Sequence, residues 1–306
     1  MSERGVVLRD EGSAVIVDLA GEETPCVVRK TLRRKMSRGA KAVVVGDIVT
    51  VEKSGDGFAI IGVEPRRSQV SRRDPSQRRR EQILVSNIDT VMVVAATKRP
   101  DLTPRLIDRF LVAAESREIP AVIVVNKIDL DEENARAPMV EGYRALGYAV
   151  LETSAETGEG VDTLRASLQD RTSVLMGHSG VGKSALANAL HPDLKLRTGD
   201  VHERTGKGLH TTSTVSLLRL PWGGYIVDTP GIREFGLWDL EPRDITFCFR
   251  EMADKMQSCR FNDCLHEREP GCAVKAAVDA GEITPWRYES YLKILETLRS
   301  DTPDAY

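Results

Sequence analysis

The chain has 306 residues, a formal net charge of −3 at pH 7, and 41% hydrophobic and 29% charged residues. Its length suggests two domains, and no stretch is long and apolar enough to span a membrane. Its first residues, Met-Ser-Glu-Arg-Gly, are charged and unlike a signal peptide, and its five cysteines are an odd number. We therefore expect a protein of the reduced cytoplasm.

The N-terminal region carries short segments of alternating polarity, at residues 14–19, 42–51 and 59–63, separated by turns that contain glycine. This rhythm is typical of a small β-barrel. We favour an OB-fold for residues 1–68, although spacing alone does not separate this type from an SH3-like barrel.

The same region is strongly basic, although the chain as a whole is acidic. Residues 29–80 hold fifteen Lys or Arg against five Asp or Glu. One group consists of Arg33, Arg34, Lys35, Arg38 and Lys41, and a second consists of Arg66, Arg67, Arg72, Arg73, Arg78, Arg79 and Arg80. The second group falls mainly in a linker, residues 69–86, which we expect to be unstructured until bound. Charge runs can be merely solvated, but this asymmetry favours binding to nucleic acid.

Phe58 is the only aromatic residue between positions 1 and 82. Proteins that hold single strands usually stack successive bases on aromatic side chains. The region therefore favours recognition of the backbone and shape of folded RNA, and we expect no DNA partner. An Arg-rich segment that becomes ordered on phosphates should lose affinity steeply as salt rises.

Residues 87–240 are predicted to form an α/β domain around a buried sheet. Residues 88–96 and 121–125 are continuous apolar runs, and Thr103 followed by Pro104 is a helix-start signal. Open α/β sheets bind their ligands at the carboxyl ends of strands. The residues that follow each apolar run are therefore candidate ligand contacts.

Asn126-Lys127-Ile128-Asp129 follows one of these runs. The carboxylate of Asp129 can accept two hydrogen bonds from the N1–H and N2–H2 edge of guanine, and adenine lacks this pair of donors. Because a buried carboxylate left unpaired is unfavourable, the site should reject ATP. We expect Asn126 to brace the neighbouring loops and the stem of Lys127 to cover the base.

Thr153-Ser154-Ala155 follows another apolar strand, residues 147–151. The tripeptide alone is common in proteins. After a guanine-reading motif it indicates a supporting loop, in which a backbone N–H of Ser154 or Ala155 meets the guanine oxygen.

Gly177-His178-Ser179-Gly180-Val181-Gly182-Lys183-Ser184 fits the phosphate-loop pattern Gly-x-x-x-x-Gly-Lys-[Ser/Thr]. A predicted strand at 172–176 enters it and a predicted helix at 184–190 leaves it, whereas a flexible Gly-Ser turn would need neither. Backbone N–H groups would point at phosphate oxygens, Lys183 would reach the β and γ phosphates, and Ser184 would ligate Mg²⁺. The expected nucleotide contacts are Gly177, Ser179, Gly180, Val181, Gly182, Lys183, Ser184 and Ala185.

A third phosphate element, Asp-Thr-Pro-Gly, starts at Asp228 after the short strand 225–227, which a predicted hairpin joins to residues 215–220. Asp228 would hold a water bound to Mg²⁺, and the N–H of Gly231 would sense the γ-phosphate. Ras-like proteins carry a glutamine after this glycine to orient the attacking water. This chain has Ile232, so hydrolysis should be slow or should rely on another group.

The Gly-rich segment 205–212 lies between the phosphate loop and Asp228, where a switch belongs. Thr211 or Thr212 could close on Mg²⁺, and His210 could aim water or stabilise charge once a partner orders the segment. The alternative for His210 is an ordinary surface histidine. His210, Thr212 and Lys183 are the candidate catalytic residues.

The order of these motifs is the reverse of the usual one. In most GTPases the phosphate loop opens the domain and the guanine motif closes it, whereas here the guanine motif comes about fifty residues earlier. The sequence therefore predicts a circularly permuted GTPase. The permutation also places the second switch directly before residues 233–238 and the C-terminal region, so that nucleotide state can act on that region.

The C-terminal region contains the pattern Cys-x4-Cys-x-His-x5-Cys. The four residues are Cys259, Cys264, His266 and Cys272. Three thiolates and one imidazole suit a tetrahedral, structural zinc ion, and the alternative is disulfide bonds. Cys26 and Cys248 are then predicted to be packing residues.

A helix is expected from Thr284, as N-cap, and Pro285 to about residue 299. Its apolar side would carry Tyr288, Tyr291, Leu292 and Leu295, which we interpret as core residues.

The assembled motifs resemble the ribosome small-subunit-dependent GTPase A family, RsgA or YjeQ. The resemblance covers nearly the whole chain, and it differs at Ser213, where the family often has threonine, and at Ala185, where serine is common. It implies an enzyme that binds GTP, GDP, Mg²⁺ and Zn²⁺ and acts in late maturation of the small ribosomal subunit. That subunit would stimulate hydrolysis, and the factor would then be released.

We therefore expect three domains and a linker, at residues 1–68, 69–86, 87–240 and 241–306. The expected protein is a monomeric, cytoplasmic GTPase whose barrel and linker bind ribosomal RNA and whose zinc module makes a second contact. One alternative is a permuted GTPase that assembles the large subunit. Another is a GTP-dependent RNA-binding switch in which hydrolysis is incidental. A metabolic kinase fits least, because the guanine motif has no role in it.

Overall fold

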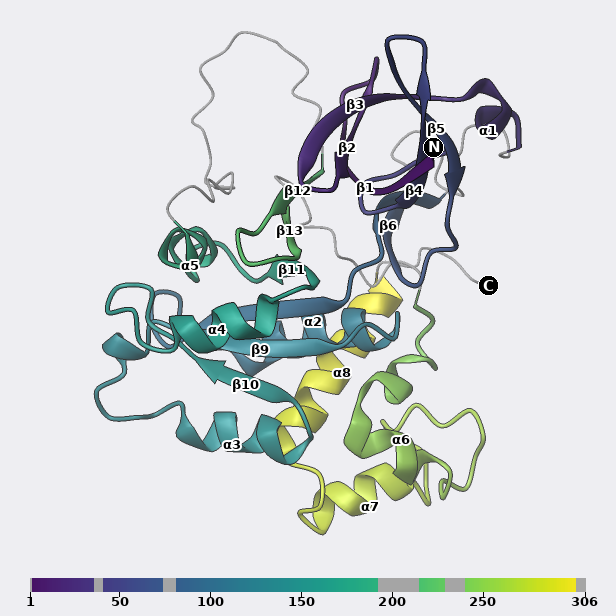
Figure 1. Cartoon of the computed structure of the whole chain (residues 1–306). Helices are drawn as coiled ribbons and strands as arrows, with labels where there is room; N and C mark the ends of the chain where they lie inside the picture. Colours follow the sequence, from purple (N-terminus) through teal and green to yellow (C-terminus); the bar gives the residue numbers. More distant parts are fainter. Residues whose placement is uncertain (1, 36–40, 74–80, 192–214, 229–239, 301–306) are drawn as a thin grey trace, which may run out of the picture. The chain divides into compact units, whose positions relative to one another are not determined.

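The computed structural model describes residues 2–35, 41–73, 81–191, 215–228 and 240–300 (Figure 1). The chain divides into two compact units. The first contains Met1–Thr90, Leu164–Leu175 and Leu190–Phe235, and the second contains Val91–Thr163, Met176–Ala189 and Gly236–Tyr306.

The first unit contains a closed five-stranded barrel. Its strands are β1 (Ser2–Asp10), β2 (Val15–Leu19), β3 (Glu22–Val28), β4 (Ile48–Ser54) and β5 (Gly57–Val63), and the short helix α1 (Lys30–Lys35) follows β3. Strand β1 pairs antiparallel with β2 and β4, β2 with β3 and β4 with β5, and a parallel β3–β5 pair completes the ring. This closed five-stranded arrangement confirms the predicted OB-like barrel.

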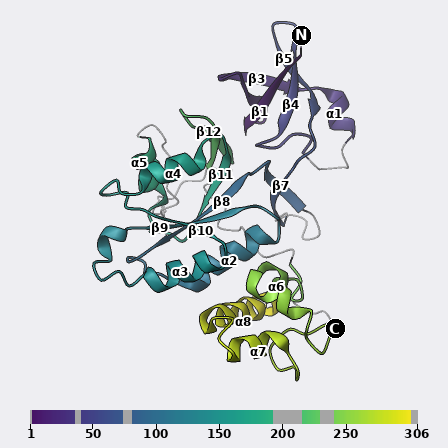
Figure 2. The same ribbon diagram turned by 60° about the horizontal axis from the view of Figure 1, so that its bottom comes forward.

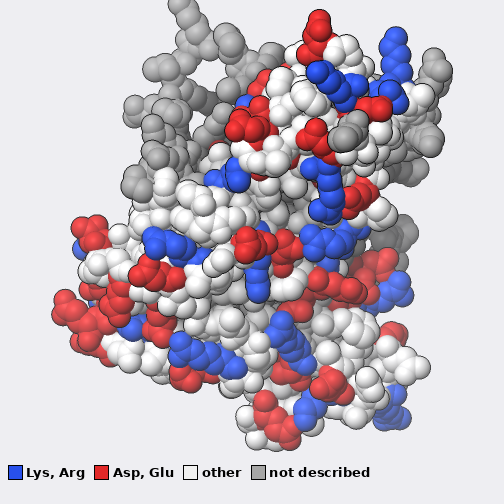
Figure 3. All heavy atoms as spheres, viewed as in Figure 1, with Lys and Arg blue, Asp and Glu red and all other residues white. Residues whose placement is uncertain are grey.

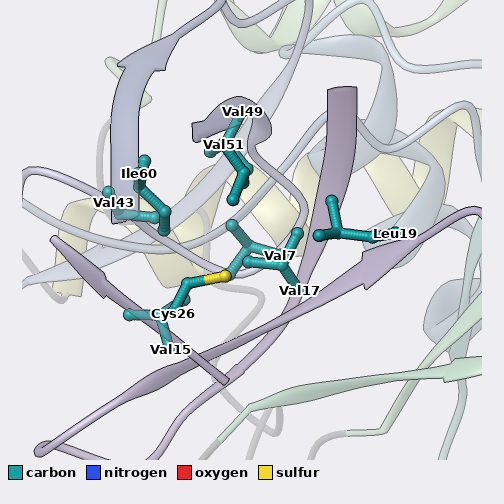
Figure 4. Packing of buried hydrophobic residues seen from close by; sticks show 9 residues of the cluster. All are labelled: Val7, Val15, Val17, Leu19, Cys26, Val43, Val49, Val51 and Ile60. Atoms are coloured by element: carbon teal, nitrogen blue, oxygen red, sulfur yellow. The ribbon is translucent and has the colours of Figure 1, made fainter. Parts of the chain in front are cut away.

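The barrel is filled by small apolar side chains. Its core consists of Val7, Val15, Val17, Leu19, Cys26, Val43, Val49, Val51 and Ile60 (Figure 4). Cys26 packs among these valines as predicted, and burial raises the pKa of its thiol to about 11. Removing such area from water stabilises the fold by about 25 cal/mol per Å².

The expected unstructured linker is partly ordered. Strands β6 (Gln69–Arg73) and β7 (Glu81–Ser86) pair antiparallel, so the prediction was wrong for these two segments. Val70 and Val85 are fully buried, and this apolar burial stabilises the strand pair. The arginine-rich composition of the segment gave no sign of it. Arg78, Arg79 and Arg80 lie outside the described residues.

One member of the predicted basic groups, Arg66, is paired with a buried carboxylate of the protein itself. Arg66 donates from Nε and Nη2 to the two carboxylate oxygens of Asp47, at 2.7 and 2.9 Å. Asp47 is fully buried and also accepts from Ser86 Oγ (2.7 Å) and the Val44 N–H (2.8 Å). Arg66 is therefore engaged in folding rather than presented to RNA. On the face drawn in Figure 3, Lys and Arg are interspersed with Asp and Glu.

The first unit also contains most of β11 (Thr172–Met176), together with β12 (Ser216–Arg219) and β13 (Tyr225–Asp228). Strand β11 runs parallel to β13, and β12 and β13 form the predicted hairpin. The hairpin is attached to the barrel, because the Tyr225 hydroxyl donates to Asp18 (2.8 Å) and Arg219 donates to the Gly21 carbonyl (2.8 Å).

The second unit contains three parallel strands, β8 (Thr90–Ala96), β9 (Ala121–Asn126) and β10 (Ala149–Glu152). The helices α2 (Pro104–Glu115) and α3 (Ala137–Ala145) follow β8 and β9 (Figure 2). Helix α2 starts where Thr103 and Pro104 predicted. Helix α4 (Val161–Leu168) follows β10, and α5 (Lys183–Leu190) starts one residue before its predicted position.

The C-terminal part of this unit consists of η3 (Ile245–Cys248), α6 (Arg250–Met256), α7 (Ala273–Asp279) and α8 (Pro285–Ser300). Helix α8 has the predicted start, Tyr291 and Leu295 are buried, and Cys248 is also buried as expected. Within the described residues, none of the helices combines the length and apolar character needed to cross a bilayer.

A buried ion cluster joins α8 to the strand-and-helix part of the unit. Arg287 of α8, 1% exposed, donates to Asp108 of α2 at 2.5 Å and, through two nitrogens, to Glu251 of α6 at 2.6 and 3.1 Å. The Tyr143 hydroxyl of α3 donates to the same Asp108 oxygen (2.6 Å), and the guanidinium lies 4.3 Å from the Phe249 ring centroid. One side chain therefore connects helices that are far apart in the sequence.

Replacing Arg287 with methionine should destabilise the protein by about 3–5 kcal/mol, because two buried carboxylates lose their counter-charge. Urea denaturation followed by circular dichroism measures this loss. The matched control is Arg299→Met on the same helix, whose exposed pair with Glu267 (2.8 Å) should contribute about 0–1 kcal/mol. Equal losses in the two variants would contradict the assignment.

Candidate functional site

Asn126, the last residue of β9, ties three loops together. It is 1% exposed, and its amide nitrogen donates to the Val181 carbonyl of the phosphate loop at 3.0 Å. Its amide oxygen accepts from the Thr153 hydroxyl and the Ala155 N–H, both at 3.3 Å. The guanine motif, the supporting loop and the phosphate loop are thus held by one side chain, which is the bracing role expected of Asn126.

Two glycines of the phosphate loop are required by crowding. A Cβ on Gly182, where φ is +97°, would meet the Asn126 amide nitrogen at 2.3 Å. A Cβ on Gly177 would meet the Val94 carbonyl oxygen of β8 at 2.1 Å. The loop therefore packs against β8 and Asn126 more closely than any side chain at these positions permits.

Both lysines of the site bind backbone carbonyls. Lys183, the first residue of α5, donates from Nζ to the carbonyls of Gly177 and His178, each at 2.9 Å. Lys127 donates to the carbonyls of Gly180 (2.6 Å) and Arg99. The Lys127 stem therefore runs from the guanine motif to the phosphate loop.

The carboxylate of Asp129 lies on η1 (Ile128–Leu130), at the exposed edge of this site. Sequence reasoning expected a buried carboxylate, but Asp129 is exposed. The fully buried Ser154 donates to Asp129 Oδ1 at 2.5 Å and accepts from the Thr157 N–H at 3.1 Å. Ser154 thereby fixes one carboxylate oxygen, and the Ala155 N–H is engaged by Asn126.

The remaining predicted residues are distributed over both units. Ser179 lies in the phosphate loop, and Ser184 and Ala185 lie in the first turn of α5. Asp228 ends β13 in the first unit and is buried. His210, Thr211, Thr212, Gly231 and Ile232 lie outside the described residues.

A second cluster brings together the C-terminal cysteines and histidine. The ligand atoms of Cys259, Cys264, His266 and Cys272 all lie within 4.8 Å of one another. His266 Nδ1 faces the sulfurs of Cys272 (3.3 Å) and Cys259 (3.6 Å). All of the chain's cysteines are free, so the alternative of disulfide bonds is not realised. A Cys3His set of this size is compatible with a tetrahedral metal ion.

The surroundings of this cluster were not foreseen from the sequence. The N–H groups of Ala273 and Lys275 point at the sulfurs of Cys259 and Cys272, both at 3.4 Å. From α8, the Tyr288 hydroxyl donates to the His266 carbonyl (2.5 Å). Burial raises the pKa of the Cys264 thiol, so an ion would have to displace its proton.

The sequence matches the family model described as RsgA GTPase over residues 63–238, which is more than half of the chain. The chain belongs to the RsgA GTPase family. It is therefore a GTP hydrolase, and the family implies GTP or GDP together with Mg²⁺.

Relatives and solved structures agree with this assignment. The chain is 44% identical over 301 residues to the small ribosomal subunit biogenesis GTPase RsgA of Gemmatimonas aurantiaca, covering 97% of this chain and 98% of the relative. The protein of that name from Chlorobaculum parvum is 43% identical over 305 residues, covering 96% and 97%.

Two crystal structures share the fold. YjeQ from Thermotoga maritima superposes with a TM-score of 0.82 at 37% identity, covering 97% of this chain and 99% of that one. YloQ, described as a circularly permuted GTPase, has a TM-score of 0.78 at 28% identity, covering 99% and 97%. The predicted circular permutation is confirmed.

Gly182→Ala should weaken GDP binding by about ten- to hundredfold, because the new methyl group displaces Asn126 and with it the phosphate loop. Titration with a fluorescent GDP analogue measures this. Gly55→Ala is the matched control, since φ there is also positive (+61°) but nothing lies within 4 Å of the added carbon. If the two variants bind GDP equally well, Asn126 does not constrain the loop as described.

Proposed function

We propose that this GTPase is a late assembly factor of the small ribosomal subunit, released after subunit-stimulated hydrolysis. The observation that carries the proposal is the near full-length similarity to proteins named small ribosomal subunit biogenesis GTPase RsgA. The basic excess of residues 29–80 supports ribosomal RNA as the surface to which the barrel region docks. The factor acts as a monomer in the cytoplasm, and the free thiols fit that compartment.

In the proposed nucleotide site, Asp129 accepts hydrogen bonds from guanine while Ser154 orients its carboxylate. The Ala155 N–H, which donates to Asn126 Oδ1 at 3.3 Å, would turn to the guanine oxygen, and the stem of Lys127 would cover the base. Gly177 and Gly182 leave no room for a Cβ. A loop without side chains at these positions would let phosphate oxygens approach the backbone N–H groups. Lys183 would exchange its two loop carbonyls for the β and γ phosphates.

Ser184 and Asp228 would hold Mg²⁺, directly and through water. When bound, the ion neutralises charge between the β and γ phosphates. Thr212 is proposed as a further ligand, Gly231 as the γ-phosphate sensor, and His210 as the group that orients water or stabilises charge. Ile232 has no polar group that could orient the attacking water. A group from the ribosomal partner would then complete the site, and hydrolysis would depend on the small subunit.

The Cys3His cluster is proposed to bind zinc in a structural role. Three sulfurs and one imidazole nitrogen fill a tetrahedral shell and leave no open position for substrate. The N–H groups aimed at Cys259 and Cys272 fit thiolates, which accept hydrogen bonds better than thiols do.

Cys272→Ser should lose the metal and unfold the loop that surrounds it, because three ligands rarely hold a structural ion. The purified wild type should contain about one zinc per chain by atomic emission. Cys26→Ser, in the barrel core, should keep that content. Full zinc content in Cys272→Ser would reject the assignment.

The proposed function is tested by GTP turnover of the purified protein alone, with small subunits, and with large subunits, at two salt concentrations. Small subunits alone should raise turnover by about tenfold or more, and the stimulation should fall steeply with salt because phosphate contacts are lost. Stimulation by large subunits only would favour a large-subunit factor. Equal turnover in all mixtures would reject ribosome-coupled hydrolysis.

A further inference from the structure

Thr97 follows β8 directly and belongs to none of the GTP-binding motifs. It is 8% exposed, and its N–H donates to the Asn126 carbonyl at 3.0 Å, which continues the pairing of β8 with β9. Its hydroxyl donates to the Lys127 carbonyl at 2.5 Å. Thr97 thus contacts two consecutive carbonyls of the guanine motif.

The backbone that Thr97 holds is unusual. Lys127 has φ 61° and ψ 37°, a left-handed conformation that residues with side chains seldom adopt unless neighbouring groups fix it. The Lys127 carbonyl also accepts from the Leu130 N–H at 3.0 Å, which closes the turn of η1. The hydroxyl of Thr97 and the N–H of Leu130 therefore converge on one carbonyl oxygen.

Asp129 lies within this turn, so the backbone of the turn sets the direction of the Asp129 carboxylate. Within the described part of the chain, the Ser154 hydroxyl donates to Oδ1 of this carboxylate, and Asp129 is exposed. Apart from the Lys127 carbonyl, the turn is anchored by the Ile128 N–H, which donates to the Thr153 carbonyl at 3.2 Å. A shift of the Lys127 peptide would therefore move Asp129 relative to the base.

We propose that Thr97 is a positioning residue for guanine recognition, whose hydroxyl fixes the left-handed Lys127 turn and so aims the Asp129 carboxylate. The proposal rests on the proposed role of Asp129 in reading guanine. The simpler alternative is that Thr97 only fills space beside β8. In that case its hydroxyl would affect stability but not the choice between bases.

The test compares GDP with inosine diphosphate, whose base lacks the exocyclic amino group and can make only one of the two hydrogen bonds to Asp129. Dissociation constants are measured for the wild type, Thr97→Val, Thr97→Ala and Thr97→Ser, alongside unfolding by urea. Thr97→Val removes the hydroxyl at nearly constant volume, and Thr97→Ala is a second variant without the hydroxyl. Thr97→Ser keeps the hydroxyl and removes only the methyl group. Thr90→Val, at the buried opposite end of β8, is the control for lost packing and polarity.

The wild type should prefer GDP. In Thr97→Val and Thr97→Ala, the dissociation constant of inosine diphosphate divided by that of GDP should fall by about three- to tenfold. A change of this size corresponds to the loss of one hydrogen bond. Thr97→Ser and Thr90→Val should keep the wild-type ratio. An unchanged ratio in Thr97→Val and Thr97→Ala, even with weaker binding of both nucleotides, overturns the role of Thr97. No preference in the wild type instead overturns the reading of guanine by Asp129, and the Thr97 proposal with it.

Discussion

The buried amide of Asn126 is the constraint on which the nucleotide site depends. A buried amide is stable only when its donors and acceptors are paired, and here the partners come from the phosphate loop on one side and from Thr153 and Ala155 on the other. The crowding of Gly182 against this amide leaves the loop little freedom to move away. Because the connection is made in space, it does not depend on which motif comes first along the chain. This explains physically how a permuted order preserves one site.

Within the second unit, a series of contacts connects the guanine motif with the C-terminal Cys3His cluster. Lys127 binds the Arg99 carbonyl just before α2, and Asp108 on α2 pairs with Arg287 on α8. One turn along α8, Tyr291 donates to the Leu265 carbonyl beside His266, at 3.0 Å. The guanine motif, the phosphate loop and the Cys3His cluster therefore belong to the same unit, and these contacts connect them.

The sequence predicted best where a local signal decides the structure. Strand β11 has the predicted bounds because a short apolar run enters a Gly-rich loop, and α8 starts where Thr284 and Pro285 indicate. Strand β3 was missed because only Cys26 among its residues is buried, which leaves no alternation to recognise. Arg287 and Thr97 could not be found in the same way. Their roles depend on Asp108, Glu251 and Lys127, which are distant in sequence, and an arginine on a helix or a threonine after a strand carries no signal of such partners.

Recognition of guanine by Asp129 can be tested by exchanging the base of the nucleotide. Asp129→Asn replaces one acceptor oxygen with a donor, which suits xanthine because that base carries a carbonyl where guanine has its amino group. The wild type should bind GDP far more tightly than xanthosine diphosphate, and Asp129→Asn should reverse this preference. If Asp129→Asn binds GDP as the wild type does, Asp129 does not read the base.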